Sequence, residues 1–227
     1  MQDSGDCGTT ILPLWNSWNI AAGNKHIPIG GHAITKRLSQ LLSEHQGVSL
    51  NTTTELDLVR QIKESCCYIK NNSNEKKIWQ LPDAKNISLT SEQYMCTEIL
   101  FNPSLLGLEH KGIHEAIYDT IMKCDMDLRM ELAGNILLAG GNTTFPGFAE
   151  RLQREIAALC PPKMKVNIIE PNNRVMSAWI GGSILTSLSS FEQRWITKEQ
   201  YEEEGNRLVK RKWFHTMYEN DIPIFFG

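Results

Sequence analysis

The sequence ILLAGGNTTFPG occupies residues 136–147, and NRVMSAWIGGSIL follows at residues 173–185. The first segment begins with four apolar residues typical of a buried strand, then continues into a glycine pair and a proline suited to a helix start. Backbone N–H groups at such a strand–turn–helix junction can approach a phosphate or a nucleotide ring. Spacing alone leaves an ordinary loop as the alternative, because glycine pairs punctuate many loops.

The composition of the 227 residues is that of an ordinary globular protein, with 41% hydrophobic residues, 22% charged residues and a mean hydropathy of −0.31. The net charge of −3 gives no basic footprint, so neither nucleic acid nor a membrane is expected as a partner. No apolar run approaches the roughly 20 residues of a membrane span, and residues 1–6 lack the pattern of a signal peptide.

Six cysteines are scattered along the chain without a CxxC pair, so no zinc or redox site is predicted. The neighbours Cys66 and Cys67 favour helix packing over a reactive site. This cysteine usage favours a reducing compartment, either the cytoplasm or the nucleus.

Hydrophobic periodicity predicts alternating strands and helices, and therefore an α/β fold class. Thr52 and Glu55 form the pattern of a capping box at a helix start. Strands are predicted at 8–15, 135–139 and 163–170, and helices from about Gly31, at 52–67, 113–123, 126–133, 146–159, 176–187 and 198–205.

The motif DSGDCGTT at residues 3–10, taken with the two segments quoted above, closely resembles the actin and actin-related protein family. In that resemblance the motif is the second phosphate-binding hairpin of the superfamily that includes actin, Hsp70 and the sugar kinases. The resemblance covers residues 3–214, roughly the C-terminal three-fifths of an actin. It implies an actin-like nucleotide-binding fold made of the second lobe and the C-terminal remnant of the first.

The resemblance also implies a division into subdomains. Residues 1–29 and 110–176 correspond to a mixed sheet with helices like actin subdomain 3, and residues 30–109 to an insertion like subdomain 4. Residues 177–214 correspond to the C-terminal helices of subdomain 1. Residues 215–227 form an extra apolar tail whose role stays open.

A nucleotide site follows from the resemblance, with ATP or ADP and Mg²⁺ as its ligands. Asp3 would reach the Mg²⁺ through water, and no side chain is expected to bind a metal directly. Arg60, Lys63 and Glu64 share one helix face, for which a solvated Arg60–Glu64 pair is the alternative. The nucleotide-binding residues implied by the resemblance are Asp3, Gly5, Asp6, Gly31, Arg60, Lys63, Glu64, Gly140, Gly141, Asn142, Thr144 and Phe145.

Departures from the family pattern predict weak nucleotide binding. Cys7 replaces a glycine of the hairpin, Thr10 replaces the histidine near the attacking water, and Val175 replaces a base-stacking lysine. The sequence starts at Met1, so the first phosphate loop of the family has no counterpart in it. We expect that this chain alone is not an ATPase, because phosphoryl transfer needs donors from both sides of a closed cleft.

Two surfaces are implied as partner sites. The first is a groove for partner helices, formed by Trp179, Ile180, Ile184, Leu185 and Leu188. The same spacing suits any buried helix, so core packing is the alternative. The second is an apolar plug between protomers, formed by Phe101, Leu105, Leu106 and Leu108, for which a loop tucked into its own domain is the alternative.

The sequence therefore predicts an actin-related structural or interaction protein of the cytoplasm and cytoskeleton. Its expected partners are actin, other actin-related proteins or actin-binding proteins, and it is expected not to polymerise normally. Two alternatives stay open. The chain is a fragment of a full-length ATP-binding, actin-like ATPase, or it is a nuclear actin-related scaffold subunit.

Overall fold

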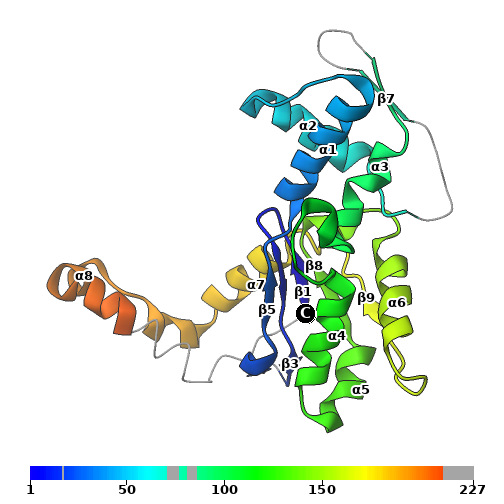
Figure 1. Cartoon of the computed structure of the whole chain (residues 1–227). Helices are drawn as coiled ribbons and strands as arrows, with labels where there is room; N and C mark the ends of the chain where they lie inside the picture. The colour runs from blue at the N-terminus through cyan, green and yellow to red at the C-terminus, as the bar shows by residue number, and fades with distance from the viewer. Residues whose placement is uncertain (17, 71–76, 81–85, 212–227) are drawn as a thin grey trace.

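A five-stranded mixed sheet in the order β5-β2-β1-β8-β9 lies at the centre of the protein (Figure 1). The structure, a computed structural model, describes residues 1–16, 18–70, 77–80 and 86–211. The strand β1 pairs antiparallel with β2 and parallel with β8, so the N-terminal hairpin lies beside a strand from far along the chain. The five strands are β1 (Gln2–Ser4), β2 (Thr9–Ile11), β5 (Lys25–Ile27), β8 (Ile136–Ala139) and β9 (Ile168–Ile169).

The α/β class is confirmed, because helices and strands alternate along the described chain. The α-helices are α1 (Gly31–Gln46), α2 (Thr53–Cys66), α3 (Glu92–Met95), α4 (Ile113–Lys123), α5 (Met126–Gly134), α6 (Phe148–Leu159), α7 (Ser177–Thr186) and α8 (Lys198–Glu204). Short 3₁₀ helices are η1 (Ala21–Gly23), η2 (Thr97–Leu100), η3 (Pro103–Leu106), η4 (Gly141–Thr144) and η5 (Ser189–Arg194). Two hairpins lie outside the central sheet: β3 (Leu14–Trp15) pairs with β4 (Trp18–Asn19), and β6 (Lys77–Gln80) pairs with β7 (Asn86–Leu89).

Three predicted boundaries are wrong. The strand predicted over residues 8–15 is two short strands, because Pro13 has no N–H for a sheet ladder. The strand predicted over residues 163–170 is only β9. The helix predicted from Pro146 begins at Phe148, because Gly147 precedes it with a left-handed backbone, φ 82°.

The helices α1, α2 and α3 and the β6–β7 hairpin form a unit beyond one end of the sheet (Figure 1). The predicted capping box of α2 is confirmed: the Thr52 hydroxyl accepts from the N–H of Glu55, and the Glu55 carboxylate accepts from the N–H of Thr52 at 2.9 Å. The apolar stripe of α1, which is Ile34, Leu38, Leu41 and Leu42, is fully buried. Burial of such side chains stabilises the fold by about 1.5–3 kcal/mol each.

The helices α4, α5 and α6 lie together beside the sheet (Figure 1). The helix α4 packs against β2 and β5 on one side and against α6 on the other. One continuous core runs from the sheet through these helices into the α1–α2 unit, and it includes Ile11, Leu138, Ile117, Leu152 and Ile34. This shared core holds the N-terminal hairpin and the start of α1 in a fixed relation.

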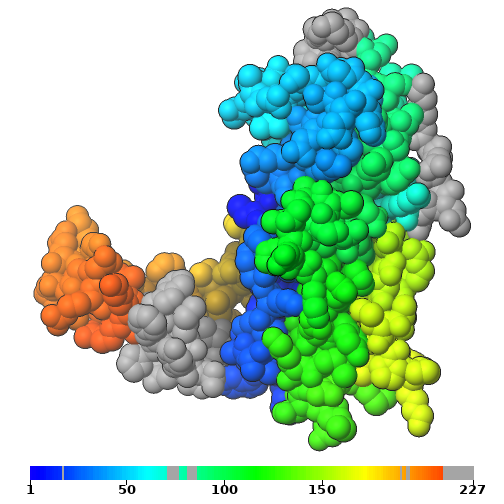
Figure 2. Space-filling model, in the orientation of Figure 1, coloured from blue at the N-terminus to red at the C-terminus, as the bar shows by residue number. Residues whose placement is uncertain are grey.

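The segment from α7 through η5 to α8 projects from the rest of the protein as an arm (Figures 1 and 2). The described part of the arm ends at Arg211, and the predicted tail 215–227 lies outside the described residues. Within the described chain, no helix combines the length and the apolar content that crossing a bilayer requires.

Candidate functional site

The turn between β1 and β2 lies directly on the N-terminal end of α1. The N–H groups of Gly31 and His32 donate to the carbonyl oxygens of Gly5 and Asp6, each at 3.0 Å. Glycine at position 30 permits this approach, because a Cβ there would lie 2.4 Å from the carbonyl oxygen of Asp6. The first two N–H groups of α1 are thus used within the protein, and an anion at this helix end must find other donors.

Asn142, in η4, connects the segment 136–147 to this turn. Its side-chain Nδ2 donates to the carbonyl oxygen of Gly5 at 2.7 Å and lies 3.1 Å from the Ser4 hydroxyl. The Asn142 side chain is buried, and so is Ser4, whose hydroxyl also lies 2.8 Å from that of Thr9. Buried amides and hydroxyls need such partners, so these bonds fix η4 against the hairpin.

Gly31 stands where three polar side chains from different segments converge. A Cβ at this position would lie 2.9 Å from Asp6 Oδ1, 3.1 Å from Lys63 Nζ and 3.2 Å from Asn142 Oδ1. Any side chain larger than hydrogen would therefore fill the space that these groups surround. We call Gly5, Asp6, Gly31, Lys63 and Asn142 the Gly31 cluster.

Lys63, on α2, provides the positive charge of the Gly31 cluster. The residue is 4% exposed, and its ammonium donates to the carbonyl oxygen of Gly31 at 3.2 Å. Burial lowers the pKa of Lys63, while the nearby carboxylates of Glu64 and Asp6 oppose that shift. A cation that is desolvated and held beside a glycine turn suits an anionic ligand such as a phosphate.

The glycine pair after β8 has two different environments. Gly140 has φ 88°, and a Cβ there would lie 2.4 Å from Asp3 Oδ1, so it is packed tightly against β1. Gly141 is exposed, and a Cβ there would meet no atom within 4 Å. The exposed Thr144 donates from its hydroxyl to the carbonyl oxygen of Gly141 at 2.7 Å. Gly140 is therefore required for close packing against β1, whereas Gly141 borders open space.

A row of polar residues crosses three strands of the sheet. Asp3 pairs with Thr10 across β1 and β2, and Thr10 pairs with His26 across β2 and β5. The Thr10 hydroxyl and His26 Nδ1 are 3.1 Å apart. Partial burial raises the pKa of the Asp3 carboxyl. Sequence reasoning missed His26, because only the strand register brings it beside the hairpin.

Several predicted nucleotide residues lie outside the Gly31 cluster. Arg60 and Glu64 are exposed, and Arg60 forms an ion pair with Asp57 at 3.3 Å rather than the alternative pair with Glu64. Phe145 is 7% exposed and packs into the core. Of the predicted set, the structure joins Gly5, Asp6, Gly31, Lys63 and Asn142, and places Asp3 in contact with Gly140.

The predicted groove residues, which lie on or just after α7, are exposed or half-buried on the arm. Trp179 is 69% exposed and Ile184 is 45% exposed, while Ile180, Leu185 and Leu188 are half-buried. The interpretation of α7 as a buried core helix is wrong, because none of its residues is buried within the described chain. Val175 and Met176, which are 57% and 52% exposed, extend this surface and were not predicted. We call these seven residues the α7 surface.

Comparison with known sequences identifies the family of the chain. The sequence profile of the family described as Actin matches residues 1–214. The chain belongs to the actin family. It is 37% identical over 227 residues to a protein named "Putative actin-29" from Dictyostelium discoideum, and this match covers 93% of the chain. The chain spans 59% of the length of that relative.

Actin-family membership gives the Gly31 cluster a context, since proteins of this family typically bind a nucleotide with Mg²⁺. The bare Gly31, the open Gly141 and the buried Lys63 fit one side of such a site. The Asp3 carboxylate lies against Gly140, and among the described residues no three metal-binding side chains cluster. Asp3 is the carboxylate that would face a hydrated Mg²⁺ if a nucleotide bound there.

The predicted plug is mostly turned inward. Phe101 is 5% exposed, its ring lies 5.9 Å from that of His114 and 6.0 Å from that of Phe148, and the Arg151 guanidinium lies 5.1 Å from it. Leu106 and Leu108 pack partly against the core, and Leu105 is 45% exposed. Phe101 therefore packs inside its own domain, as the alternative interpretation predicts, while Leu105 is exposed and accessible to another molecule.

Proposed function

We propose that this actin-family chain is a structural or interaction protein of the cytoplasmic cytoskeleton. It binds actin or another actin-related protein through the α7 surface and does not polymerise normally. The observation that supports this proposal best is the exposure of α7, an apolar helix that buries none of its residues within the described chain.

The physical argument begins with the composition of α7. Its sequence SAWIGGSILT contains no charged residue, and Trp179 and Ile184 are its most exposed apolar side chains. Exposed apolar surface of this kind favours an interaction site, and aromatic side chains dominate the energetics of such sites. Burying a large apolar side chain contributes about 1.5–3 kcal/mol, so a partner that covers Trp179 and Ile184 gains substantial binding energy.

The charges near the α7 surface favour a partner with a basic rim. Glu170 pairs with Arg174 at 3.0 Å just before α7, which neutralises that end. The helix α8 then carries four exposed glutamates, at positions 199, 202, 203 and 204, of which Glu202 pairs with Lys198 at 3.8 Å and Glu204 with Arg211 at 3.0 Å. Complementary charges at the rim of an apolar contact speed association and select partners, more than they add affinity.

The inward packing of the plug supports a chain that does not add normally to a filament. Leu105 is the one exposed side chain of the four predicted plug residues, and Phe101 belongs to the core. An inter-protomer contact through this loop therefore has one exposed apolar side chain to offer, beside the half-buried Leu106 and Leu108, which is small beside the α7 surface.

Substitution at Ile184 and Leu188 tests the proposal. Ile184→Asp and Leu188→Asp place a carboxylate in the apolar contact, and each is expected to weaken binding to purified actin by at least about tenfold. The matched control is Leu159→Asp on α6, where Leu159 is 39% exposed and distant in sequence from the arm. Co-sedimentation and labelled-monomer titration measure binding. Equal binding by Leu188→Asp and the control would contradict the proposal.

A second function, weak binding of ATP or ADP with Mg²⁺, is favoured by the Gly31 cluster. We propose binding without hydrolysis by this chain on its own, because the first N–H groups of α1 are already paired and Lys63 is the cation beside Gly31. Electrostatic catalysis of phosphoryl transfer needs more donors than this. Nucleotide binding without hydrolysis would also fit a fragment of a longer ATPase. If the protein were found in the nucleus, a nuclear scaffold role would replace the proposed cytoskeletal role.

Titration with a fluorescent ADP analogue tests this second function. Lys63→Met is expected to abolish binding, whereas Lys36→Met, on the exposed side of α1, is expected to leave it unchanged. Indistinguishable binding by the two variants would mean that the Gly31 cluster does not hold the nucleotide.

A further inference from the structure

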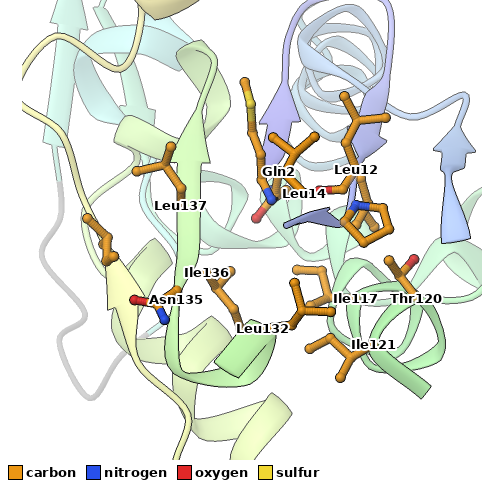
Figure 3. A pocket seen from close by; sticks show the side chains of 14 residues that line it. Gln2, Leu12, Leu14, Ile117, Thr120, Ile121, Leu132, Asn135, Ile136 and Leu137 are labelled. Carbon is orange, nitrogen blue, oxygen red and sulfur yellow. Dashed lines mark hydrogen bonds between the residues drawn. The ribbon is translucent and has the colours of Figure 1, made fainter. Parts of the chain in front are cut away.

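A group of three buried cysteines, Cys66, Cys67 and Cys96, lies in the α1–α3 unit. An apolar cavity of about 300 Å³ lies at the other end of the sheet, between β1, β8, α4 and α5 (Figure 3). The lining of that cavity contains no cysteine and no charged side chain. Thiol chemistry in this protein therefore concerns the α1–α3 unit and not the cavity.

Two of these three cysteines form a close pair of thiols. Cys67 follows the last residue of α2, and Cys96 follows the last residue of α3, 29 positions further along the chain. The Cys96 thiol donates to the Cys67 sulfur at 3.5 Å, and the two residues are 0% and 3% exposed. A disulfide bond is about 2.05 Å long, so the sulfurs need to approach by about 1.5 Å. Both residues lie at helix ends, which relax more easily than a helix interior.

Hydrogen bonds around the pair hold the two helix ends against each other. The N–H of Tyr68 donates to the carbonyl oxygen of Gln93 at 3.3 Å, and the Thr97 hydroxyl donates to the carbonyl oxygen of Tyr68 at 2.8 Å. These bonds join the residue after Cys67 to the residue after Cys96 and to the last turn before it. The fold therefore fixes which of the two neighbouring cysteines of α2 faces Cys96, and that cysteine is Cys67.

The surroundings of Cys67 determine how its thiol reacts. The hydrogen bond from Cys96 and burial raise the pKa of the Cys67 thiol well above its usual value, so the thiol stays protonated at neutral pH. The ammonium groups of Lys63 and Lys77 act in the opposite direction and favour the thiolate. Cys67 is therefore the sulfur that two cations assist when it ionises, and Cys96 is the thiol in contact with it.

We propose that Cys67 and Cys96 are a redox modification site, at which a hydroperoxide converts the thiol pair into a disulfide. The Cys67 thiolate attacks a peroxide oxygen, so that an S–O bond forms and the O–O bond breaks. The Cys96 sulfur then attacks the Cys67 sulfur, so that the S–S bond forms and water leaves. In total the two thiols lose two protons and two electrons, and hydrogen peroxide becomes two molecules of water.

The disulfide joins the end of α2 covalently to the end of α3. The N–H of Cys67 donates to the carbonyl oxygen of Lys63 at 3.1 Å, so the link also fixes the last turn of α2. Disulfides that form in a reducing compartment are usually transient and are reversed by thiols. The site is separate from the α7 surface, so its test succeeds or fails independently of the proposed function.

Treatment of the full chain with hydrogen peroxide tests the proposal. The treated protein is denatured, its remaining free thiols are alkylated, and mass spectrometry of its peptides identifies the linked cysteines. In the folded chain the link between Cys67 and Cys96 is expected to exceed every other cysteine pair by at least about tenfold. Dithiothreitol is expected to restore both thiols. Oxidation of the chain after unfolding in urea is expected to lose this preference, because the fold brings the two sulfurs together.

A pair of neighbouring substitutions locates the reaction on α2. Cys67→Ala removes the sulfur that contacts Cys96 and is expected to abolish the link, whereas Cys66→Ala is expected to leave it unchanged. Circular dichroism shows whether both variants fold, and the peptide map of the unmodified chain decides the proposal without them. A different dominant pair in the folded chain, six alkylated cysteines after peroxide treatment, or the same pairs in folded and unfolded chain would overturn the proposal.

Discussion

The side-chain amide of Asn142 donates a 2.7 Å hydrogen bond to the carbonyl oxygen of Gly5, which lies 137 positions earlier in the chain. This bond ties η4 to the β1–β2 turn, and that turn accepts the first two N–H groups of α1. Asn142 thus links the three segments that the actin-family resemblance assigns to one nucleotide site. The bond therefore makes this junction part of the fold itself.

Loss of the Asn142 side chain is expected to destabilise the whole fold. Asn142→Ala removes the donor to Gly5 and leaves buried polar atoms unpaired, so the free energy of unfolding should fall by about 2 kcal/mol. Urea denaturation followed by tryptophan fluorescence measures this change. The exposed Asn172→Ala is the control and should stay within about 0.5 kcal/mol of the unmodified protein. A similar small effect for both variants would mean that the Asn142–Gly5 hydrogen bond does not stabilise the fold.

The adjacent glycines of the same turn should respond differently to one methyl group. Gly140→Ala places a Cβ 2.4 Å from Asp3 Oδ1 on a backbone with φ 88°, so a loss of at least about 2 kcal/mol is expected. Gly141→Ala meets no atom within 4 Å and should change the unfolding free energy by less than about 1 kcal/mol. Thermal denaturation of both variants provides the comparison. Equal melting temperatures would show that the turn relaxes freely around Gly140.

The α/β class and most helices could be predicted from the sequence because their signals are local. The capping box at Thr52 and the apolar stripe of α1 depend on spacing within one helix, and both are confirmed. The motif at residues 3–10 indicated the family only through resemblance. Short strands such as β9 were overestimated, since alternation of side chains does not say how many residues find a pairing partner.

The candidate site residues also differ in whether local sequence or tertiary packing determines their contacts. Gly31 and Asn142 were predicted, but their contact with Lys63 and Asp6 depends on how three distant segments pack. The exposure of α7 was expected only from the family resemblance, because the spacing of an apolar helix is the same whether its own chain or a partner covers it. His26 carried no sequence signal, since its position beside Thr10 follows from strand register alone.

Two residues of the predicted plug should differ sharply in their effect on stability. Phe101→Ala removes a buried ring from contact with His114, Phe148 and Arg151, so a loss of about 3–5 kcal/mol is expected. Leu105→Ala removes a side chain that is 45% exposed and should cost less than about 1 kcal/mol. Urea denaturation of the two variants distinguishes a core residue from a surface one. A large loss at Leu105 would place it in the core instead.

A buried carboxylate in the α1–α3 unit should make stability depend on pH. The Glu92 side chain is 3% exposed and accepts hydrogen bonds from the N–H of Thr90 at 2.9 Å, the Thr90 hydroxyl at 3.0 Å and His45 Nδ1 at 3.0 Å. Burial alone would raise the pKa of Glu92. Hydrogen bonds from the backbone of residues 90 and 92 and from His45 outweigh burial and lower the pKa from 4.5 to about 2.

The pKa of Glu92 is lower in the folded chain than its ordinary value, so its contribution to stability is fully present above pH 4.5 and is lost as the pH falls towards 2. Glu92→Gln removes the charge while keeping the shape, and it should abolish that part of the pH dependence. The difference in unfolding free energy between the unmodified protein and Glu92→Gln should shrink by on the order of 3 kcal/mol across this window. Urea denaturation at several pH values measures it, with the exposed Glu131→Gln as the control that should follow the unmodified protein. A constant difference between pH 4.5 and pH 2 would mean that the hydrogen bonds to Glu92 do not favour its charged form.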